Sequence, residues 1–535
     1  MTPHLTTLTD IISFGADRFP DRVALESSAT PHALTYRQLW DCARRGAHAL
    51  RRRGLERGDR VLLAAPPGPD WLLAFFSIEQ AGLVAVPIPD GIGAALVAAV
   101  AAHTQTRVCI SGPEQMAGPS TALRAGQVSC VTMPGLLDET VGTLDQQNHA
   151  SDATALLAFT SGSTARPRAV ALSHANIIAN LRALMAARQS DGAETMLSML
   201  PPAHLYELVV GQLAPLVVGG RIVYAGPLLP NRLVNALGEH GVTRALAVPA
   251  LLEALCREVL GGLVERGAVR PACQHGSAVG IAMKLRQLGA PERERLRLAV
   301  RDRIGDAFRG VGLGGAAIGP GWPEVLALLG IGMDVGYGLT EAGPLVSLGW
   351  ASNCPPGSVG RPLPGVAVRI DPHGEILVRS AAVMQGYFGD AAATSATLED
   401  GWLRTGDRGY LDADGFLYIA GRLKEAMVTA AGDTLHPEEV EPYYASRFFA
   451  EHCVVPLRGS DGNDVPALVV VPRQQGSDED LQREFGELRA AAPARYRVTT
   501  MVCRTEPLPR TLLGKLKRRE LGALCTQTSK PACVN

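Results

Sequence analysis

The sequence has no surplus of charge of either sign. Among its 535 residues, 51 Lys and Arg stand against 52 Asp and Glu, so the formal charge is −1. Proteins that bind nucleic acid or anionic membranes without specificity carry a strongly basic surface, and this balance argues against both partners. Long apolar runs are also missing, because the segment 92–102 is shorter than the ~18 apolar residues of a membrane helix. We therefore expect no transmembrane segment and no nucleic-acid partner.

Paired cysteines are missing too. The ten cysteines are scattered, without a C-x-x-C motif or a histidine cluster at metal-ligand spacing, so a structural zinc site is not expected. Near the start of the chain, Asp10, Asp17 and Asp21 interrupt any apolar run, and the segment is therefore not expected to be a signal peptide. Free thiols and the absence of a signal peptide predict a cytoplasmic protein.

The composition is that of a globular protein. Hydrophobic residues make up 47% and charged residues 19%, which excludes disorder and coiled coil as the main architecture. At roughly 150 residues per domain, the length predicts about three or four structural units. Strand-like runs at 61–66, 106–111 and 221–225 alternate with helical stretches. This alternation predicts an α/β fold in which parallel-rich sheets are joined by crossover helices.

One helix can be predicted together with both of its ends. Thr35 is placed to cap a helix whose apolar face runs from Leu39 to Leu50. Gly54 stands where a glycine belongs just past the helix end. The segment represents the helical half of the α/β pattern.

The pattern changes near residue 357. From there to about 420, short alternating pieces are broken by Pro, Gly and Asp, which predicts a small antiparallel sheet or distorted β-barrel. A second change at 421–441 is followed by a compact α+β stretch. We therefore predict a large N-terminal domain over 1–422 and a small, mobile C-terminal domain over 423–535.

The segment TSGSTARPRAV, at 160–170, alternates small hydroxyl residues with glycine. Backbone N–H groups and hydroxyls in such a loop can wrap phosphate oxygens, and an arginine adds positive charge. No Gly-Lys-Ser/Thr sequence occurs in the chain, which disfavours an ordinary P-loop NTPase. Taken alone, the segment is equally consistent with an exposed Ser/Thr turn. The candidate phosphate ligands are Thr160, Ser161, Gly162, Ser163, Thr164 and Arg168.

A second candidate, GYGLTEAGP at 336–344, places an aromatic ring, a hydroxyl and a carboxylate close together. Tyr337 could stack on a purine, and Thr340 could hold a phosphate oxygen. Glu341 offers the hard oxygen ligand that Mg²⁺ prefers. A strand end followed by a Gly/Pro turn is the better interpretation of this segment when it is taken alone.

Further candidates lie near the predicted domain boundary and in the C-terminal part. Asp407, with Arg422 beyond it, could accept two ribose hydroxyl hydrogens, although turn aspartates usually bond to their own backbone. Lys515 follows Gly514, which lets the backbone approach a partner closely. The adjacent basic residues at 517–519 are predicted to form the solvated face of a short helix.

In this order and spacing, the four segments resemble the adenylate-forming superfamily of acyl-CoA synthetases, peptide-synthetase adenylation domains and luciferases. The resemblance covers essentially the whole chain. The segments LPPAHLYE (200–207), EILVRS (375–380) and GRLKE (421–425) are most similar to the long-chain acyl-CoA synthetase branch.

The resemblance implies a nucleotide and metal site. The loop at 160–168 would hold the β- and γ-phosphates of ATP, Tyr337 would stack on adenine, and Thr340 would bind the α-phosphate. Glu341 would be the Mg²⁺ ligand. The implied nucleotide-binding residues are Thr160, Ser161, Gly162, Ser163, Thr164, Arg168, Gly315, Ala316, Tyr337, Gly338, Thr340, Asp407 and Arg422, of which Asp407 and Arg422 would hold the ribose.

The resemblance also implies three catalytic residues. Lys515 would bridge the carboxylate and the α-phosphate in the first half-reaction, and Lys424 would occupy the hinge between the domains. His204 matches a position between the acyl pocket and the thiol tunnel, although a histidine after two prolines is also consistent with a packed loop residue. The backbone at 314–316 would pass close to the adenine and the acyl chain.

The chain departs from the family pattern in two places. Ala165, Arg168 and Ala169 stand where the family usually has Gly, Lys and Gly; arginine keeps the charge and can grip phosphate with two N–H groups, so slower but retained use of ATP is expected. The segment at 312–321 lacks the serine that often precedes the paired glycines, which leaves the shape of the acyl pocket open.

The expected activity is that of an acid–thiol ligase. ATP with Mg²⁺ would activate a small carboxylic acid, expected to be a fatty acid, to an acyl-adenylate with release of pyrophosphate, and the acyl group would pass to CoA. One alternative acceptor is the phosphopantetheine thiol of an acyl carrier protein. Another alternative is a degenerate nucleotide-binding protein without ligase activity. A dinucleotide oxidoreductase, suggested by GVGLGG at 310–315 with Asp334 beyond, is disfavoured because Pro320 and Pro323 interrupt the helix that should follow.

Overall fold

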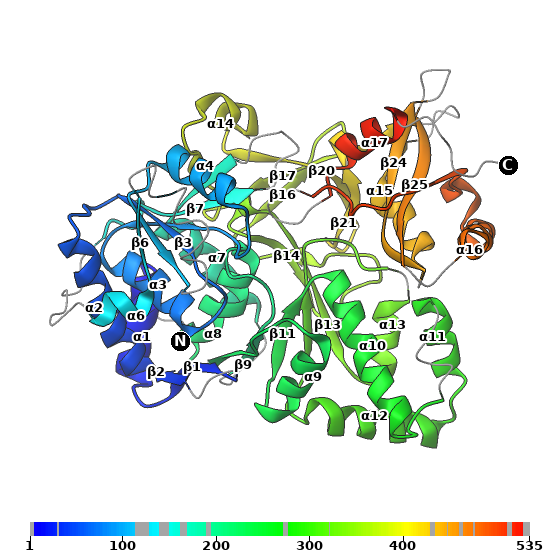
Figure 1. The fold of residues 1–535 in the computed structure, drawn as a ribbon, viewed down its shortest axis with the longest axis horizontal. Coiled ribbons are helices and arrows are strands. Elements are labelled where there is room, and N and C mark those ends of the chain that lie inside the picture. Colours follow the sequence, from blue (N-terminus) through cyan, green and yellow to red (C-terminus); the bar gives the residue numbers. More distant parts are fainter. Residues whose placement is uncertain are drawn as a thin grey trace.

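The computed structural model describes residues 5–28, 32–112, 123, 128–138, 149–160, 168–188, 194–270, 277–319, 321–428, 434–446, 448–458, 464–473, 477–510 and 516–527. Within these ranges, no helix is long and apolar enough to span a membrane. Two large sheets, a small antiparallel sheet and a C-terminal α+β part make up the molecule (Figure 1).

The first large sheet has seven strands and is parallel at its centre. In spatial order its strands are β18 (Gly386–Tyr387), β8 (Arg168–Ser173), β7 (Thr154–Thr160), β4 (Val84–Pro87), β3 (Arg60–Ala64), β5 (Val108–Ser111) and β6 (Ser129–Val131). Strands β3 to β7 pair in parallel, whereas β8 and β18 form antiparallel pairs at one edge. The strands predicted at 61–66 and 106–111 are confirmed here as β3 and β5.

The second large sheet has nine strands. In spatial order they are β15 (Arg361–Pro362), β14 (Leu345–Gly349), β13 (Gly332–Gly338), β12 (Gly310–Leu313), β11 (Arg244–Ala247), β9 (Thr195–Ser198), β10 (Arg221–Tyr224), β1 (Val23–Ser27) and β2 (His32–Thr35). The six strands from β13 to β1 in this order are parallel. The strand predicted at 221–225 is confirmed as β10, and the α/β class is confirmed with it.

Helices cover these sheets in two groups. One buried apolar cluster joins α1, α2, α3, α7 and α8 to strands of both large sheets, and a second packs α9 to α13 against β11 and β12 (Figure 1). The helices before the small sheet are α1 (Thr9–Arg18), α2 (Tyr36–Arg52), α3 (Pro69–Gln80), α4 (Ala94–Thr104), α6 (Met133–Asp138), α7 (His174–Ala187), the π-helix η2 (Glu207–Leu213), α8 (Ala214–Val217), α9 (Pro230–Glu239), α10 (Pro249–Glu265), α11 (Ala278–Arg286), α12 (Ala290–Ile304) and α13 (Trp322–Leu329).

Helix α2 has the ends that the sequence predicts. The Thr35 side chain accepts a hydrogen bond from the backbone of Gln38, whose own side chain accepts from the Thr35 backbone, which is a complete capping box. Gly54 follows the C-cap residue Arg53 and has φ of 75°, a left-handed conformation that favours glycine.

The region from 357 to 420 forms a small antiparallel sheet only in part. Its strands are β16 (Ala367–Ile370), β17 (Glu375–Arg379), β20 (Trp402–Leu411), β19 (Leu398–Glu399) and β21 (Leu417–Arg422), with α14 (Ala391–Thr397) beside them. Two segments depart from the prediction, because β15 joins the nine-stranded sheet and β18 joins the seven-stranded one. The exposed edge of β8 offers backbone partners to β18, a long-range pairing that short alternating patterns do not reveal.

The C-terminal part has its own apolar cores. The buried residues of these cores all lie between Met427 and Cys525. Its elements are the short helix η5 (Leu423–Glu425), β22 (Met427–Val428), β23 (Thr434–Leu435), α15 (Pro437–Val440), η6 (Glu441–Tyr444), β24 (Phe449–Arg458), β25 (Asp464–Pro472), α16 (Asp478–Ala491), η7 (Ala494–Tyr496), β26 (Thr500–Cys503) and α17 (Arg518–Gln527). The division at 422/423 and the mobility of this part stay predictions.

The predicted solvated face at 517–519 is wrong for Arg518. Its side chain is 14% exposed and pairs with Glu425 at 3.0 Å and with Glu441 at 2.8 Å. Both glutamates lie far away in the sequence, so the basic run alone could not reveal these pairs. Lys517 is 43% exposed and pairs with Glu520 at 3.0 Å, as a solvated residue would.

Candidate functional site

Three predicted site residues form one hydrogen-bonded group, here named the Asp407 cluster: Tyr337, Asp407 and Arg422. Asp407 and Arg422 are direct cross-strand partners on β20 and β21. The Tyr337 hydroxyl, near the end of β13, donates to Asp407 Oδ2 at 2.7 Å, and Arg422 Nε lies 2.7 Å from Oδ1. The structure therefore brings together residues from two of the predicted motifs.

Burial strengthens the electrostatics of the Asp407 cluster. The Asp407 side chain is 5% exposed. Burial, together with the adjacent Asp407 carboxylate, raises the pKa of Tyr337 well above its usual range, so the phenol stays a donor. Burial disfavours the charged form of Arg422, but the carboxylate of Asp407 and the nearby acids outweigh it and raise the pKa of Arg422. Arginine and aspartate thus form a charged pair.

Thr405, which the sequence interpretation missed, holds the backbone of Asp407 in place. The Thr405 hydroxyl accepts from the backbone N–H of Asp407 at 3.0 Å and donates to the carbonyl of Ile376 on β17 at 2.7 Å. This contact ties Asp407 to the neighbouring strand. The sequence signal was only a threonine two residues before the aspartate, which is too common to identify it.

The second group, here named the Tyr387 bridge, consists of Arg168, Glu341 and Tyr387. The Arg168 guanidinium lies over the Tyr387 ring, 5.1 Å from its centroid. The Tyr387 hydroxyl lies 3.0 Å from Glu341 Oε1 and donates to it. Burial and the Glu341 carboxylate raise the pKa of Tyr387 to about 12. Tyr387 was not a sequence candidate, because it lies in the stretch that was expected to belong entirely to the small sheet.

The two ends of the predicted phosphate loop are adjacent. Thr160, the last residue of β7, is the register partner of Arg168, the first residue of β8. Four candidate phosphate ligands lie outside the described residues: Ser161, Gly162, Ser163 and Thr164.

The turn that carries Thr340 and Glu341 has little room for change. A Cβ on Gly338 would lie 1.8 Å from the carbonyl oxygen of Pro344, so only glycine fits there. The short helix η4 (Thr340–Ala342) is held by the buried Asn180, whose amide donates to the carbonyl of Ala342 at 3.4 Å and to that of Leu345 at 2.8 Å. Glu341 therefore projects from a fixed turn.

The expected acyl side is apolar and close-packed. The Tyr206 ring lies against Gly312 and Gly314, where a Cβ on Gly314 would come within 3.0 Å of it. Gly315 has φ of 87°, and Ala316 is exposed. A small apolar cluster flanks this point; its buried members are Met196, Leu200 and Leu246, with Tyr206, Val210, Val248 and Leu251 packed against them.

His204 stands just before the π-helix η2 and is half-buried. Its carbonyl accepts from Leu208 N–H at 3.0 Å. The first residue of η2, Glu207, is fully buried and accepts from the Ser198 hydroxyl at 2.6 Å. Burial, outweighing the hydrogen bonds to its carboxylate, raises the pKa of Glu207 to about 8. The predicted place of His204 between the acyl and thiol sides stays a prediction.

Of the other two predicted catalytic residues, one lies among the described residues and the other does not. Lys424 is exposed on η5, the turn that follows β21. Lys515 lies outside the described residues. The contact of Lys515 with any substrate therefore stays a prediction.

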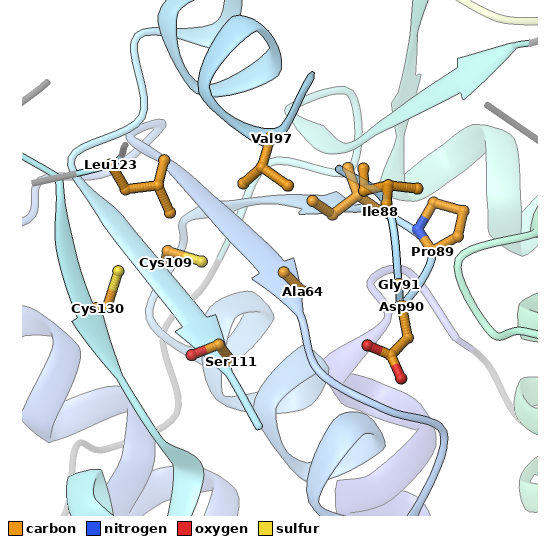
Figure 2. Close-up of a pocket in the computed structure, with 11 residues that line it drawn as sticks. Ala64, Ile88, Pro89, Asp90, Gly91, Val97, Cys109, Ser111, Leu123 and Cys130 are labelled. Carbon is orange, nitrogen blue, oxygen red and sulfur yellow. The ribbon is translucent and has the colours of Figure 1, made fainter. Parts of the chain in front are cut away.

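Two cavities lie away from these groups. One of about 20 Å³ lies among β3, β5, β6 and α4 and is lined by Cys109 and Cys130, by apolar residues, and by Asp90 and Ser111 (Figure 2). This volume holds about one water, too little for an acyl chain. The other, of about 290 Å³, is lined by charged residues such as Arg244 and Asp334 at the amino ends of β11 and β13. Neither contains a predicted site residue.

The described part of the chain holds no group of three or more His, Cys, Asp or Glu side chains arranged for a metal ion. A tightly caged metal is therefore not a feature of this part. Mg²⁺ commonly binds through one or two protein carboxylates together with substrate phosphates. The carboxylate of Glu341 is an oxygen donor that suits this second kind of site.

The amino-acid sequence of the chain is similar to those of known enzymes. Residues 14–388 match the model of a family described as AMP-binding enzyme. A feruloyl-CoA synthase from Amycolatopsis is 29% identical, covering 94% of this chain and 96% of the relative. A long-chain-fatty-acid–CoA ligase from Bacillus subtilis is 26% identical (96% and 94% covered). The fatty acid–[acyl-carrier-protein] ligase ScoC from Streptomyces coeruleorubidus is 28% identical (97% and 96% covered).

Solved structures share the fold over nearly the whole chain. The o-succinylbenzoate CoA synthetase from Bacillus subtilis, in complex with its acyl-adenylate, gives a TM-score of 0.78 at 21% identity, covering 96% of this chain and 97% of that one. The anthranilate CoA ligase AuaEII, in complex with anthranoyl-AMP, gives 0.80 at 18% identity, with 98% of both chains covered. The arrangement of a large N-terminal α/β part and a smaller C-terminal part is therefore an established fold.

Proposed function

The chain belongs to the family of AMP-binding enzymes, and we propose that it joins a carboxylic acid to a thiol through an acyl-adenylate. The sequence resemblance to the adenylate-forming superfamily is thereby confirmed. The observation that carries the proposal is the Asp407 cluster, in which Tyr337 and Arg422 converge on one buried carboxylate. The Tyr387 bridge supplies the cation and the acid that ATP chemistry needs beside it.

The proposed chemistry solves a leaving-group problem. A carboxylate is a poor electrophile because its leaving group would be oxide. In the first step a carboxylate oxygen attacks the α-phosphorus of ATP, an O–P bond forms, and the bond to the bridging oxygen breaks to release pyrophosphate. In the second step a thiolate attacks the acyl carbon, a C–S bond forms, and AMP leaves with the electrons of the C–O bond. The thiol proton passes to solvent or to a base.

The Asp407 cluster suits ribose binding. A carboxylate has about four lone-pair sites, and those that face Tyr337 and Arg422 leave others for two ribose hydroxyls. Because the Tyr337 hydroxyl is bonded to Asp407, its ring is fixed before a purine arrives. Stacking on a fixed ring loses less conformational entropy than stacking on a mobile one.

The phosphate side uses Arg168 and Glu341. Arg168 and Thr340 would each bind a phosphate oxygen, and Glu341 would supply the carboxylate oxygen for Mg²⁺. When bound there, Mg²⁺ would neutralise phosphate charge and favour departure of pyrophosphate. Lys515 would neutralise the charge that builds up between the attacking carboxylate and the α-phosphate.

Two half-reactions at one site favour a moving C-terminal part. We assign Lys515 to adenylate formation, and Lys424 to the hinge that removes it before thiol attack. Lys515→Ala should lose adenylate formation by about 10²–10³-fold, while a supplied acyl-adenylate still reacts with thiol. Lys424→Pro should show the opposite asymmetry because it fixes φ near the hinge. Equal damage to both steps in Lys515→Ala would contradict domain alternation.

The acid is proposed to be a fatty acid and its acceptor CoA. The long-chain ligase among the relatives and the apolar cluster beside Gly312 and Gly314 support an apolar acyl chain. The feruloyl-CoA synthase supports an aryl acid instead, so aryl acids belong in the same test. ATP–pyrophosphate exchange with acids from acetate to stearate, and with aryl acids, measures both activity and preference. Exchange with aryl acids alone would overturn the fatty-acid proposal.

An acyl carrier protein is the second candidate acceptor, favoured by the similarity to ScoC. Thioester formation should be compared with CoA and with a phosphopantetheine-bearing carrier protein. The altered residues Ala165, Arg168 and Ala169 motivate the remaining alternative, a nucleotide-binding protein without ligase activity. No pyrophosphate release with any acid of the panel would establish that alternative.

A further inference from the structure

Tyr387 touches both groups that the proposed function places around the phosphates. Its ring face carries the Arg168 guanidinium, and its hydroxyl donates to Glu341. Arg168 and Glu341 come from motifs far apart in the sequence, and the contacts with Tyr387 connect the two. The Tyr387 residue is 8% exposed, so both contacts lie largely out of water.

We propose that Tyr387 is a positioning residue that sets the Arg168 guanidinium and the Glu341 carboxylate in one arrangement before Mg·ATP binds. This proposal rests on the proposed function, because it gives Arg168 a phosphate and Glu341 a metal to bind. It assigns Tyr387 no contact with substrate. Its effect passes through the two charged side chains.

The backbone around Tyr387 is fixed on both sides. The Met384 N–H donates to the Glu341 carbonyl at 2.9 Å, which ties this segment to the turn that carries the acid. The Phe388 N–H donates to the Ala169 carbonyl at 2.8 Å, one residue beyond Arg168. Between these points, Tyr387 pairs with Val170 across the β18–β8 ladder. The ring therefore belongs to a short strand whose flanking backbone is hydrogen-bonded to both motifs.

The ring also gives a physical reason for an arginine at position 168. A guanidinium is planar, weakly hydrated and able to stack on an aromatic face while its edge N–H groups still point outward. A lysine ammonium is a compact, strongly hydrated charge and gains less from the same ring. Arg168 can thus be held by its face and still grip a phosphate by its edge.

The hydroxyl acts on the other partner. A neutral phenol that donates to Oε1 of Glu341 occupies one lone pair and orients the carboxylate. The second carboxylate oxygen of Glu341 and the remaining lone pairs then already have a fixed direction, so the side chain need not rotate to bind a metal. An oriented carboxylate has less rotamer freedom to lose when a metal binds.

The test separates the ring from the hydroxyl. Tyr387→Phe keeps the ring and removes the donor, whereas Tyr387→Leu removes both. Binding should be measured with α,β-methylene-ATP and Mn²⁺, using the electron paramagnetic resonance of free Mn²⁺ for the metal and calorimetry for the nucleotide. Tyr410→Phe is the matched control, because Tyr410 is 54% exposed and stacks on Tyr418 outside both groups.

We expect Tyr387→Phe to weaken Mn²⁺ binding in the presence of the nucleotide by about tenfold, the effect of losing a hydrogen bond to a charged group. Its nucleotide affinity at saturating Mn²⁺ should stay close to that of the wild type. Tyr387→Leu should show the same metal loss and, in addition, about threefold weaker nucleotide binding. In an Arg168→Ala background the Phe and Leu variants should bind the nucleotide equally, because no guanidinium is left to stack.

Several results would overturn the proposal. If Tyr387→Phe and Tyr387→Leu bound Mn²⁺ as tightly as the wild type, the hydroxyl would have no part in positioning Glu341. If Tyr387→Leu bound the nucleotide as tightly as Tyr387→Phe, the ring would have no part in positioning Arg168. If Tyr387→Leu does not fold by circular dichroism, Tyr387→Met replaces it, because the flexible, unbranched side chain of methionine adapts to irregular space. Failure of the wild type itself to bind nucleotide or to exchange pyrophosphate would instead sink the proposed function.

Discussion

The Asp407 cluster and the Tyr387 bridge are built in different ways. Asp407 and Arg422 are neighbours on paired strands of one small sheet, so the β-ladder itself sets their distance. The Tyr387 bridge joins three segments, and its geometry depends on β18 leaving the small sheet for the edge of another. The two groups are within electrostatic reach, because Glu341 contributes to the raised pKa of Arg422.

This difference predicts how each group responds to change. In the Asp407 cluster, two donors converge on one buried carboxylate, so loss of that charge removes the shared acceptor of Tyr337 and Arg422. In the Tyr387 bridge, one neutral phenol contacts both charged side chains, Arg168 through its ring and Glu341 through its hydroxyl. Mutations in the first group should therefore act through charge, and mutations in the second through position.

The largest effect is expected from Asp407→Ala. Ribose loses an acceptor for two hydroxyls, and hydrogen bonds to charged groups contribute about 1.5–3 kcal/mol each. Affinities for ATP and for AMP should both fall by about 10²-fold or more, because ribose is present in each. Calorimetric titration of both nucleotides checks this. Asp412→Ala is the matched control, since Asp412 bonds to the backbone of its own turn; unchanged ATP affinity in folded Asp407→Ala would place the ribose elsewhere.

A smaller and different effect is expected from Glu341→Gln. The amide oxygen can still accept from Tyr387, but the negative charge is gone. The Mg²⁺ concentration for half-maximal pyrophosphate exchange should rise by about tenfold, while AMP affinity stays unchanged. A variant with the Mg²⁺ dependence of the wild type would remove Glu341 from the metal site.

Arg168 gives the next smaller effect. Arg168→Ala should weaken ATP binding by about tenfold, because a charge-assisted contact to phosphate is lost. Arg168→Lys should restore much of that loss, since it keeps the charge while losing the planar fork. Apparent ATP constants from pyrophosphate exchange measure both. An alanine variant with wild-type ATP kinetics would show that the ring holds Arg168 for a purely structural reason.

The sequence predicted what depends on local chemistry. Helix α2 followed from its cap and its apolar period, whereas Tyr337, Asp407 and Arg422 were singled out through the resemblance of their motifs to a known superfamily, and the fold brings these three side chains together. Tyr387 and Arg518 were missed because their roles come from long-range pairings. A tyrosine in a short strand and an arginine in a basic run look the same whether they are buried or exposed.

The smallest effect on activity, and the sharpest contrast with Asp407, is expected from Glu207. Both carboxyls are buried, but Asp407 pairs with an arginine, whereas Glu207 is hydrogen-bonded to Ser198, Gln212 and the Leu200 backbone. At Glu207 the effect of burial therefore outweighs that of the hydrogen bonds, and the pKa of its carboxyl rises from 4.5 to about 8.

The raised pKa makes stability fall as pH rises. Between about pH 4.5 and pH 8 the folded state keeps the Glu207 proton and the unfolded state has lost it, so unfolding releases a proton and alkaline pH favours it. The contribution is complete below the unfolded pKa and is lost as pH rises through the folded one. Glu207→Gln carries no titrating group and can still accept from Ser198. The free energy of unfolding, measured in urea at several pH values, should increase in the variant relative to the wild type from pH 5 to pH 8. The ATP affinity of the variant should be unchanged. A constant difference in unfolding free energy across that range would mean that Glu207 is ionised in the folded protein.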